Sequence, residues 1–288
     1  MCIRDRSIGS LFIAGIIPGF VVVALFIGYI IWVAIRHPER VGESKVLPTA
    51  QQEARDANDL VAEKDMAAIF RSTLGLLVLI VLVLGGIWLG FFTPTEGAGV
   101  GATLALILAI MRGMTLAEMK DAILSVGRTS APLLLLLVAA QLYSRVLAMT
   151  GVTGATKEFF LDSGLSPYMI LGFMVLVWFI LGCIIDSISI ILLTVPVFAP
   201  LAIALGFDPL AFAIIGILAI ETGLLTPPFG ILVFTVKAAV TDEKDLTTGE
   251  IFRGSIPFWI VLLVTIVLIV IFPEIANWLP NVGNELAR

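Results

Sequence analysis

Long apolar runs alternate with shorter polar segments along almost the whole chain. Several of these runs exceed the roughly 18 residues that indicate a membrane span. A helix satisfies its own backbone hydrogen bonds in lipid, so the pattern predicts an all-α polytopic membrane protein. The charge-free runs that carry this prediction are Ser10–Ile35, Ser72–Thr95, Ser163–Ile185, Ser187–Phe207 and Gly254–Pro273.

The apolar run 209–236 is interrupted by two consecutive prolines near its middle, and Glu221 is its one charge. Pro227 and Pro228 have no backbone N–H, so the carbonyl groups four residues earlier, of Gly223 and Leu224, lose their helical partners. In hydrocarbon, an unpaired carbonyl costs several kcal/mol, as an order of magnitude, unless protein, water or an ion satisfies it. The pattern predicts a broken transmembrane helix over 209–239.

A simple proline kink without a functional role is the alternative interpretation of this break. A proline pair flanked by Gly223, Thr226 and Gly230 favours a functional interruption instead. Secondary transporters use such interruptions to present backbone oxygens to coupling ions and helix N-termini to anionic substrates. The decapeptide 221–230 is therefore the first candidate site.

A second polar midpoint interrupts the apolar block 167–207, at Gly182-Cys-Ile-Ile-Asp-Ser-Ile-Ser189. Two full crossings would need a solvent turn there, but no Gly/Pro/Asn turn cluster is present. The pattern predicts a re-entrant helical hairpin that holds Asp186, Ser187 and Ser189 deep in the membrane. Such an irregular backbone is tolerated only where it is buried in protein or faces water.

The block 72–111 is about twice the length of one span and breaks at Thr93-Pro-Thr-Glu96, which predicts two spans or a span plus a half-span. Thr93 or Thr95 with Pro94 is typical of a helix start, so Glu96 is interpreted as a helix cap rather than an ion ligand.

Three further segments complete the expected elements. An amphipathic helix is predicted over 50–70, as a soluble arm or lying flat on the membrane. A short amphipathic helix is predicted over 115–126, followed by an apolar run 129–144 that ends at Arg145. A polar loop is expected over 149–166, and a last span over about 256–273.

Composition agrees with a membrane protein, because 59% of the residues are hydrophobic and 14% are charged, against about 25% charged in soluble domains. The net charge of −5 and the lack of a basic patch give no indication of nucleic-acid binding. Cys2 and Cys183 cannot build a disulfide framework, and Cys183 is expected to be a packed thiol. His37, beside Arg36 at a helix end, is expected to be interfacial, with no metal cluster around it.

The distribution of Lys and Arg gives one consistent topology. By the positive-inside rule, the cytoplasmic segments are 36–71, 112–128 and 237–253. Residues 93–96 and 149–166 then lie outside, and the hairpin 167–207 enters and leaves from outside. Both polar midpoints, at Asp186 and at 226–228, meet at mid-bilayer depth in this topology.

Four motifs in order resemble the large membrane subunit of tripartite ATP-independent periplasmic (TRAP) transporters, and they cover nearly the whole chain from residue 8. They are Leu11-Phe-Ile-Ala-Gly-Ile-Ile-Pro-Gly19, Gly90-Phe-Phe-Thr-Pro-Thr-Glu96, Gly182-Cys-Ile-Ile-Asp186 with Leu193-Thr-Val-Pro196, and Gly223-Leu-Leu-Thr-Pro-Pro-Phe-Gly230. The resemblance implies an ion-transporter-superfamily-like repeat, the second of two inverted repeats, with a hairpin and a broken helix. The expected parts are a non-native start at 1–9, scaffold spans and amphipathic arm helices at 10–128, a transport-type region at 129–240, and a loop with the last span at 241–288.

The same resemblance implies a sodium-coupled, elevator-type importer in the bacterial inner membrane. It implies as partners a small membrane subunit, a periplasmic solute-binding protein and an organic-acid substrate such as a dicarboxylate. No cofactor is expected beyond Na⁺ as the coupling ion. The implied sodium ligands are Gly182, Asp186, Ser187, Gly223, Leu224 and Thr226, and the implied substrate-binding residues are Ser189, Pro227, Pro228 and Gly230.

Several roles stay open at this stage. Asp186 is either an ion ligand or a structural carboxylate that accepts bonds at the hairpin tip. Glu221 is expected to have a structural role, shaping the break or pairing with Lys237 or Arg145. Arg128 and Arg145 could neutralise a substrate carboxylate, although interfacial snorkelling is the more common role.

Two other function classes compete with transport. An intramembrane aspartyl-type protease needs two membrane-embedded aspartates, and Asp186 is the one candidate here; its pairing with Glu221 would be atypical. A non-catalytic membrane scaffold is the second rival, and two polar midpoints at one depth argue against it.

Overall fold

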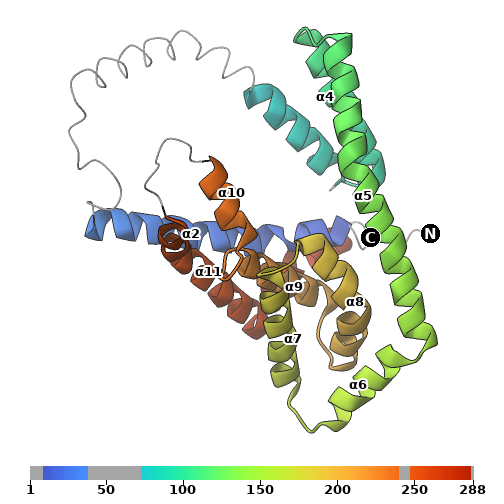
Figure 1. Cartoon of the computed structure of the whole chain (residues 1–288), viewed down its shortest axis with the longest axis vertical. Helices are drawn as coiled ribbons and strands as arrows, with labels where there is room; N and C mark the ends of the chain where they lie inside the picture. The colour runs from blue at the N-terminus through green and yellow to red at the C-terminus, as the bar shows by residue number, and fades with distance from the viewer. Residues whose placement is uncertain (1–8, 38–72, 88, 240–246, 287–288) are drawn as a thin grey trace. The chain divides into compact units, whose positions relative to one another are not determined.

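The computed structural model describes residues 9–37, 73–87, 89–239 and 247–286, and every regular element in these ranges is a helix. The expected amphipathic helix over 50–70 and residues 1–8 of the expected start lie outside the described residues. The helices are α2 (Ile16–Arg36), α4 (Pro94–Met111), α5 (Leu116–Met149), α6 (Val152–Asp162), α7 (Pro167–Gly182), α8 (Ser187–Ala204), α9 (Pro209–Leu224), α10 (Ile231–Ala239), α11 (Thr248–Ile271) and α12 (Glu274–Leu286), together with a helix Thr73–Ile87 (Figure 1).

Among the described helices, five are long and apolar enough to cross a membrane. These are Gly9–Arg36, α4, α5, α8 and α11; the helix Thr73–Ile87, α7 and α9 are apolar but shorter. The prediction of a polytopic all-α membrane protein is therefore confirmed at the level of helix length and composition.

The chain divides into two compact units, one made of Met1–Gly9 and Ile30–Ser125 and the other of Ser10–Tyr29 and Val126–Arg288. In the first unit, the helix Thr73–Ile87 and α4 pack through glycines of α4. A Cβ on Gly97 would lie 2.9 Å from the Ile87 side chain, and one on Gly101 would lie 3.2 Å from Val83 Cγ2. Small residues four apart let two membrane helices approach closely, so this pair of glycines fixes the contact.

The predicted cap at Thr93-Pro-Thr-Glu96 is confirmed. The Thr93 hydroxyl accepts a hydrogen bond from the backbone N–H of Glu96 at 3.3 Å, and Glu96 Oε2 accepts from the backbone N–H of Thr93 at 2.8 Å. This reciprocal capping box satisfies two backbone donors at the start of α4. Pro94 occupies the first turn, where its missing N–H costs nothing.

The expected short helix over 115–126 is wrong as a separate element, because α5 runs for 34 residues without interruption. Gly127 costs only about 1 kcal/mol relative to alanine inside a helix, which does not end it. Pro132 lies inside the helix and removes one backbone hydrogen bond, a loss that membrane helices tolerate.

The expected polar loop over 149–166 is also wrong for most of its length, since it contains the helix α6. Gly151 (φ 73°) and Gly164 (φ 71°) adopt left-handed backbone conformations and confine the turns to the two ends of the segment. Between them, Phe160 packs against Phe173 of α7 with ring centroids 5.6 Å apart. This aromatic packing stabilises α6 as a helix, although the charged residues of this segment had suggested a loop.

The core of the second unit is built around α9, which has ten buried residues. Helices α7, α8, α11 and α12 all contact it (Figure 1). Buried side chains from these helices form one apolar cluster, including Met174, Ile190, Ile220 and Ile269. The broken helix at the centre of the sequence prediction is thus also the centre of the packing.

Helices α7 and α8 form a hairpin around a short break. Tyr168, near the start of α7, and Phe207, after α8, have ring centroids 5.8 Å apart. Further along, the Trp178 indole N–H donates to the Thr194 hydroxyl at 2.7 Å, and both side chains are buried. The two helices are therefore antiparallel neighbours, an arrangement that either a re-entrant hairpin or two full crossings would have.

The C-terminal region differs from the expected loop and single span. Helix α11 begins at Thr248, earlier than the predicted 256, because Thr247 and Glu250 form a capping box. Helix α12 is absent from the sequence prediction. Its Ala276 and Asn277 are buried while Trp278 is 55% exposed, so it is a short amphipathic helix packed on α9 and α11.

Candidate functional site

The hairpin and the broken helix meet at two glycines. A Cβ on Gly182 would lie 2.6 Å from the Ile220 carbonyl oxygen and 2.9 Å from Gly223 Cα. A Cβ on Gly223 would meet the Phe179 carbonyl oxygen and lie 2.7 Å from Gly182 Cα. Backbone packs directly on backbone here, so only glycine fits on either side, and the predicted close approach of Gly182 is confirmed.

The hairpin turns where α8 acquires its own cap. Asp186 has an extended backbone, its Oδ2 accepts from the Ser189 backbone N–H at 3.0 Å, and its Oδ1 accepts from the Ser189 hydroxyl at 2.6 Å. Both carboxylate oxygens of this exposed residue are thus used at the start of α8. These contacts are those of a structural carboxylate at the hairpin tip, which is one of the two roles that the sequence left open for Asp186. Cys183 beside it is buried with its S–H donating to the Phe179 carbonyl, which confirms the expected packed thiol.

A hydrogen bond between side chains links the two interrupted helices. The Ser187 hydroxyl at the start of α8 donates to Glu221 Oε1 on α9 at 3.2 Å. The alternative partners proposed for Glu221 are wrong, since Lys237 donates to Thr248 Oγ1 at 2.9 Å and the described residues contain no ion pair between Glu221 and Lys237 or Arg145. The sequence did not predict Ser187 as the partner of Glu221, because the two residues are 34 positions apart.

The end of α9 corrects one detail of the predicted break. The Thr226 backbone N–H donates to the Gly223 carbonyl at 2.9 Å, so this carbonyl is not left free by Pro227. The last turn tightens to bonds between residues three apart, as helix ends commonly do. The Leu224 carbonyl is different, because no residue in the described part of the chain donates a hydrogen bond to it. Leu224 therefore presents the unpaired carbonyl that the prolines predict.

Two hydroxyl groups lie at the same break. Thr226 is buried, and its hydroxyl donates to the Thr222 carbonyl at 2.7 Å, which leaves the oxygen lone pairs available as acceptors. The Ser255 hydroxyl on α11 donates to the Leu225 carbonyl at 3.1 Å. Ser255 was not predicted; its signal is a small polar residue near the start of an apolar span.

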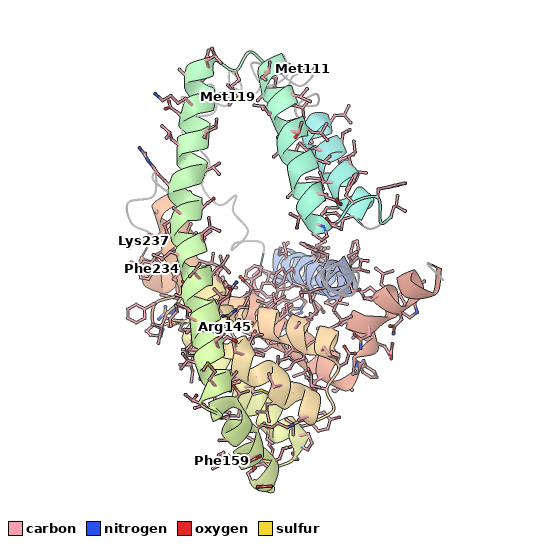
Figure 2. All side chains as sticks on the ribbon, turned by 90° about the vertical axis from the view of Figure 1, so that its right-hand side faces the viewer. Met111, Met119, Arg145, Phe159, Phe234 and Lys237 are labelled. Carbon is pink, nitrogen blue, oxygen red and sulfur yellow. The ribbon has the colours of Figure 1, made fainter. Side chains whose placement is uncertain are left out.

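The residues after the break turn the chain into α10. Pro227 and Pro228 are joined by a cis peptide bond and are exposed, while Gly230 (φ 41°) is buried against the Phe252 ring. On α10, Phe234 packs edge-on against Phe252 with ring centroids 6.4 Å apart. Figure 2 labels Phe234 and Lys237, which both belong to this helix. The break is therefore held against α11 on both sides.

The arrangement offers oxygen rather than nitrogen or sulfur donors. The described residues contain no group of three or more His, Cys, Asp or Glu side chains that could hold a metal ion. Available instead are the Leu224 carbonyl and the Thr226 hydroxyl oxygen, because the Gly223 carbonyl already accepts from the backbone N–H groups of Leu225 and Thr226. Hard cations prefer such oxygen ligands.

The predicted site residues fall into three groups. Gly182, Ser187 and Gly223 lie at the contact between the hairpin and α9. Asp186 and Ser189 bond to each other at the start of α8. The remaining predicted residues, Leu224, Thr226, Pro227, Pro228 and Gly230, follow one another through the break between α9 and α10.

Residues 1–275 match the family model of the tripartite ATP-independent periplasmic transporter, DctM component. The chain is 33% identical over 96% of its length to the C4-dicarboxylate TRAP transporter large permease protein of Pseudomonas aeruginosa, and covers 61% of that protein. It is 32% identical to the ectoine/5-hydroxyectoine large permease protein of Ruegeria pomeroyi and 28% identical to the sialic acid large permease protein of Vibrio cholerae, over 98% and 97% of its length. It covers 61% of each of these two relatives as well.

The chain thus spans about three fifths of the length of these relatives. The match nevertheless runs through both interrupted helices, because it extends from residue 1 to residue 275. The motif resemblance stated from the sequence is confirmed, and the chain belongs to the DctM component family of tripartite ATP-independent periplasmic transporters.

Proposed function

We propose that this chain carries one sodium site of a sodium-coupled, elevator-type uptake transporter. The observation that supports this most is the contact of two interrupted helices at Gly182 and Gly223, with unpaired oxygen at the end of α9. Interrupted helices whose freed carbonyls face a cavity are how transporters coordinate small cations. A single proline kink would not bring a second interrupted helix to the same place.

In this proposal the ion takes its ligands from both interruptions. The break supplies the Gly223 and Leu224 carbonyls and the Thr226 hydroxyl oxygen. The hairpin supplies Gly182, Ser187 and the remaining lone pairs of Asp186. The substrate lies beside them, against Ser189, Pro227, Pro228 and Gly230.

The wider setting is part of the same proposal. The hairpin is re-entrant, and the chain contributes one repeat of an ion-transporter-like fold in the bacterial inner membrane. It works with a small membrane subunit and a periplasmic binding protein that delivers an organic acid. The relatives named for dicarboxylates, ectoine and sialic acid support a small polar organic substrate without selecting one.

The protease alternative is set aside, because the family consists of transporter components and not of enzymes. The geometry agrees, since Asp186 uses both oxygens on Ser189 and no second aspartate faces it among the hydrogen bonds of the described residues. The scaffold alternative does not account for an unpaired carbonyl at the centre of the packed unit.

The test is Thr226→Val in the complete transporter with its partner subunits. Valine is nearly isosteric and deletes one oxygen. Loss of one ligand is expected to cost about 1–3 kcal/mol, which is roughly a 5- to 150-fold rise in the sodium concentration that half-activates uptake. Thr226→Ser keeps the oxygen and should stay near the unaltered protein.

The matched control is Thr265→Val. Thr265, on α11, is also buried, and its hydroxyl also donates to a carbonyl one turn earlier, that of Val261 at 2.9 Å. It should leave sodium activation unchanged. If Thr226→Val assembles and its sodium curve matches that of Thr265→Val, the break is not the ion site.

A further inference from the structure

Glu221 is the one charged side chain between Pro209 and Val236, and it is half-buried on α9. It lies in the last turn of the helix, three residues before the final residue Leu224. The carbonyl groups at a helix C-terminus carry a partial negative charge, so an anion is unfavourable there and a cation is favourable. The position of this carboxylate therefore needs an explanation.

No Lys or Arg among the described residues forms an ion pair with Glu221. The last turn of α9 contains no basic residue. Lys237 is hydrogen-bonded to Thr248, and the one described hydrogen bond to the Glu221 carboxylate comes from the neutral Ser187 hydroxyl. The end of α9 thus combines a carboxylate, the helix dipole and the unpaired Leu224 carbonyl, which all attract a cation.

Asp186 provides the contrast within the same unit. It lies at the N-terminus of α8, where the helix dipole stabilises an anion, and both of its oxygens accept hydrogen bonds from Ser189. Its charge is balanced by its own helix. Of the two carboxylates at the interruptions, Glu221 is the one whose environment lacks compensation.

We infer that Glu221 supplies the negative charge that balances the bound cation, and that Ser187 orients this carboxylate from the hairpin. The inference rests on the proposed function. It adds Glu221, which is not among the predicted sodium ligands, as the residue that balances the charge of the cation. The Ser187–Glu221 hydrogen bond makes the charge part of the contact between hairpin and broken helix.

The experiment uses Glu221→Gln in the complete transporter with its partners. Glutamine retains an acceptor for Ser187 but removes the charge. Two quantities are measured: the sodium concentration that half-activates uptake, and the thermal unfolding midpoint of the purified complex as sodium replaces choline at constant ionic strength. A ligand that binds only the folded state raises this midpoint, and at a given concentration a tighter ligand raises it more.

The inference predicts different effects of Glu221→Gln without and with sodium. Without sodium, Glu221→Gln should unfold at the same or a higher temperature than the unaltered protein, because an unfavourable charge has gone from the helix end. Addition of sodium should raise the unfolding midpoint of the variant less than that of the unaltered protein. Half-activation of uptake should require about tenfold more sodium, the change expected for about 1.4 kcal/mol of lost interaction. A merely structural glutamate would make the variant less stable in both conditions.

Two further variants separate charge from hydrogen bond. Ser187→Ala keeps the charge but removes both its orienting hydrogen bond and a proposed ligand oxygen, so it should also raise the half-activating sodium concentration, without the gain in sodium-free stability expected of Glu221→Gln. Glu158→Gln removes an exposed glutamate of α6 and should shift nothing. If Glu221→Gln matches Glu158→Gln while Thr226→Val still shifts, the role of Glu221 is overturned and the sodium site stands. If the unaltered complex shows no sodium dependence in either measurement, the proposed function itself fails.

Discussion

Helices α5 and α9 are both apolar helices that contain glycine, yet they have opposite environments. α5 has 34 residues and none is buried, whereas α9 has 16 residues and ten are buried. Their glycines differ in the same way. A Cβ on Gly127 of α5 would meet no atom within 4 Å, but Gly216 and Gly223 of α9 lie against an indole ring and a backbone.

The difference shows what determines the centre of a membrane unit. Lipid is as apolar as leucine, so hydrophobicity alone does not draw one membrane helix against another. Glycines that admit a neighbour, and hydroxyl groups that bond across helices, select α9 for the centre. α5 has its large apolar side chains on the outside, including Leu134 and Leu135, which are 61% and 72% exposed.

The largest effect is expected for Gly223→Val. The new Cβ would meet the Phe179 carbonyl oxygen and Gly182 Cα, which are backbone atoms that cannot move aside. The cost should exceed about 5 kcal/mol, beyond ordinary overpacking, and the protein should fail to assemble. The measurement is the folded yield of the complex by size-exclusion chromatography. Gly172→Val, at an open glycine of α7, is the control, and equal yields would show that α7 and α9 do not touch.

Ile220→Ala tests the packing of α9 by creating a cavity. Ile220 is 2% exposed in the apolar cluster, so the free energy of unfolding should fall by about 2–5 kcal/mol. Ile217 on the same helix is 40% exposed, and Ile217→Ala should cost much less. Chemical denaturation in detergent measures both. Similar costs for the two variants would mean that burial does not distinguish the two faces of α9.

Thr194→Val removes the partner of the Trp178 indole N–H within the hairpin. A buried donor left without an acceptor should cost about 1–3 kcal/mol in unfolding free energy. Thr194→Ser retains the oxygen and should recover most of the loss. Thermal unfolding followed by tryptophan fluorescence reports both the stability and the environment of the indole. Equal midpoints for the valine and serine variants would contradict the role of the hydrogen bond.

Gly127→Ala should act with the opposite sign to Gly223→Val. Gly127 lies inside a helix with open space around it, so alanine should raise the free energy of unfolding by roughly 0.5–1 kcal/mol. The same detergent denaturation measures the gain. A loss of stability would mean that another helix, from a partner or from elsewhere in the protein, packs against this point of α5.

The smallest effect is expected for Leu135→Ala on α5. An exposed leucine leaves no cavity when truncated, so the change should stay within about 0.5 kcal/mol. The variant is best compared with Ile220→Ala in one denaturation series. A cost near that of Ile220→Ala in the assembled transporter, but not in the separated subunit, would identify this face of α5 as a subunit interface.

The sequence predicted the interruptions better than it predicted the connections. The break at Pro227–Pro228 follows from local chemistry, because proline has no N–H, and the interruption near Asp186 is visible as a polar midpoint in an apolar block. The helix α6 was missed because its charged residues are typical of a loop. The packing of Phe160 on Phe173 that stabilises it involves another helix. Contacts between distant elements are not visible in local patterns.

The site shows the same limit. The glycine approach at Gly182 was predicted from residue type alone and is confirmed. The rebonding of the Gly223 carbonyl depends on how tightly the last turn of α9 winds, which a count of missing donors does not determine. The partner of Glu221 lies in the hairpin, and no spacing rule in the sequence links Ser187 to position 221.

The reciprocal caps at Thr93–Glu96, Thr115–Glu118 and Thr247–Glu250 have a consequence for biosynthesis. Each one closes within four consecutive residues, so helices α4, α5 and α11 can each start with satisfied backbone donors as soon as the ribosome has released that short stretch. The contact between hairpin and broken helix is different, because Ser187 must wait for Glu221 to be made. Membrane insertion can therefore proceed helix by helix for the capped segments, while the contact between hairpin and broken helix forms only after α9 has been synthesised.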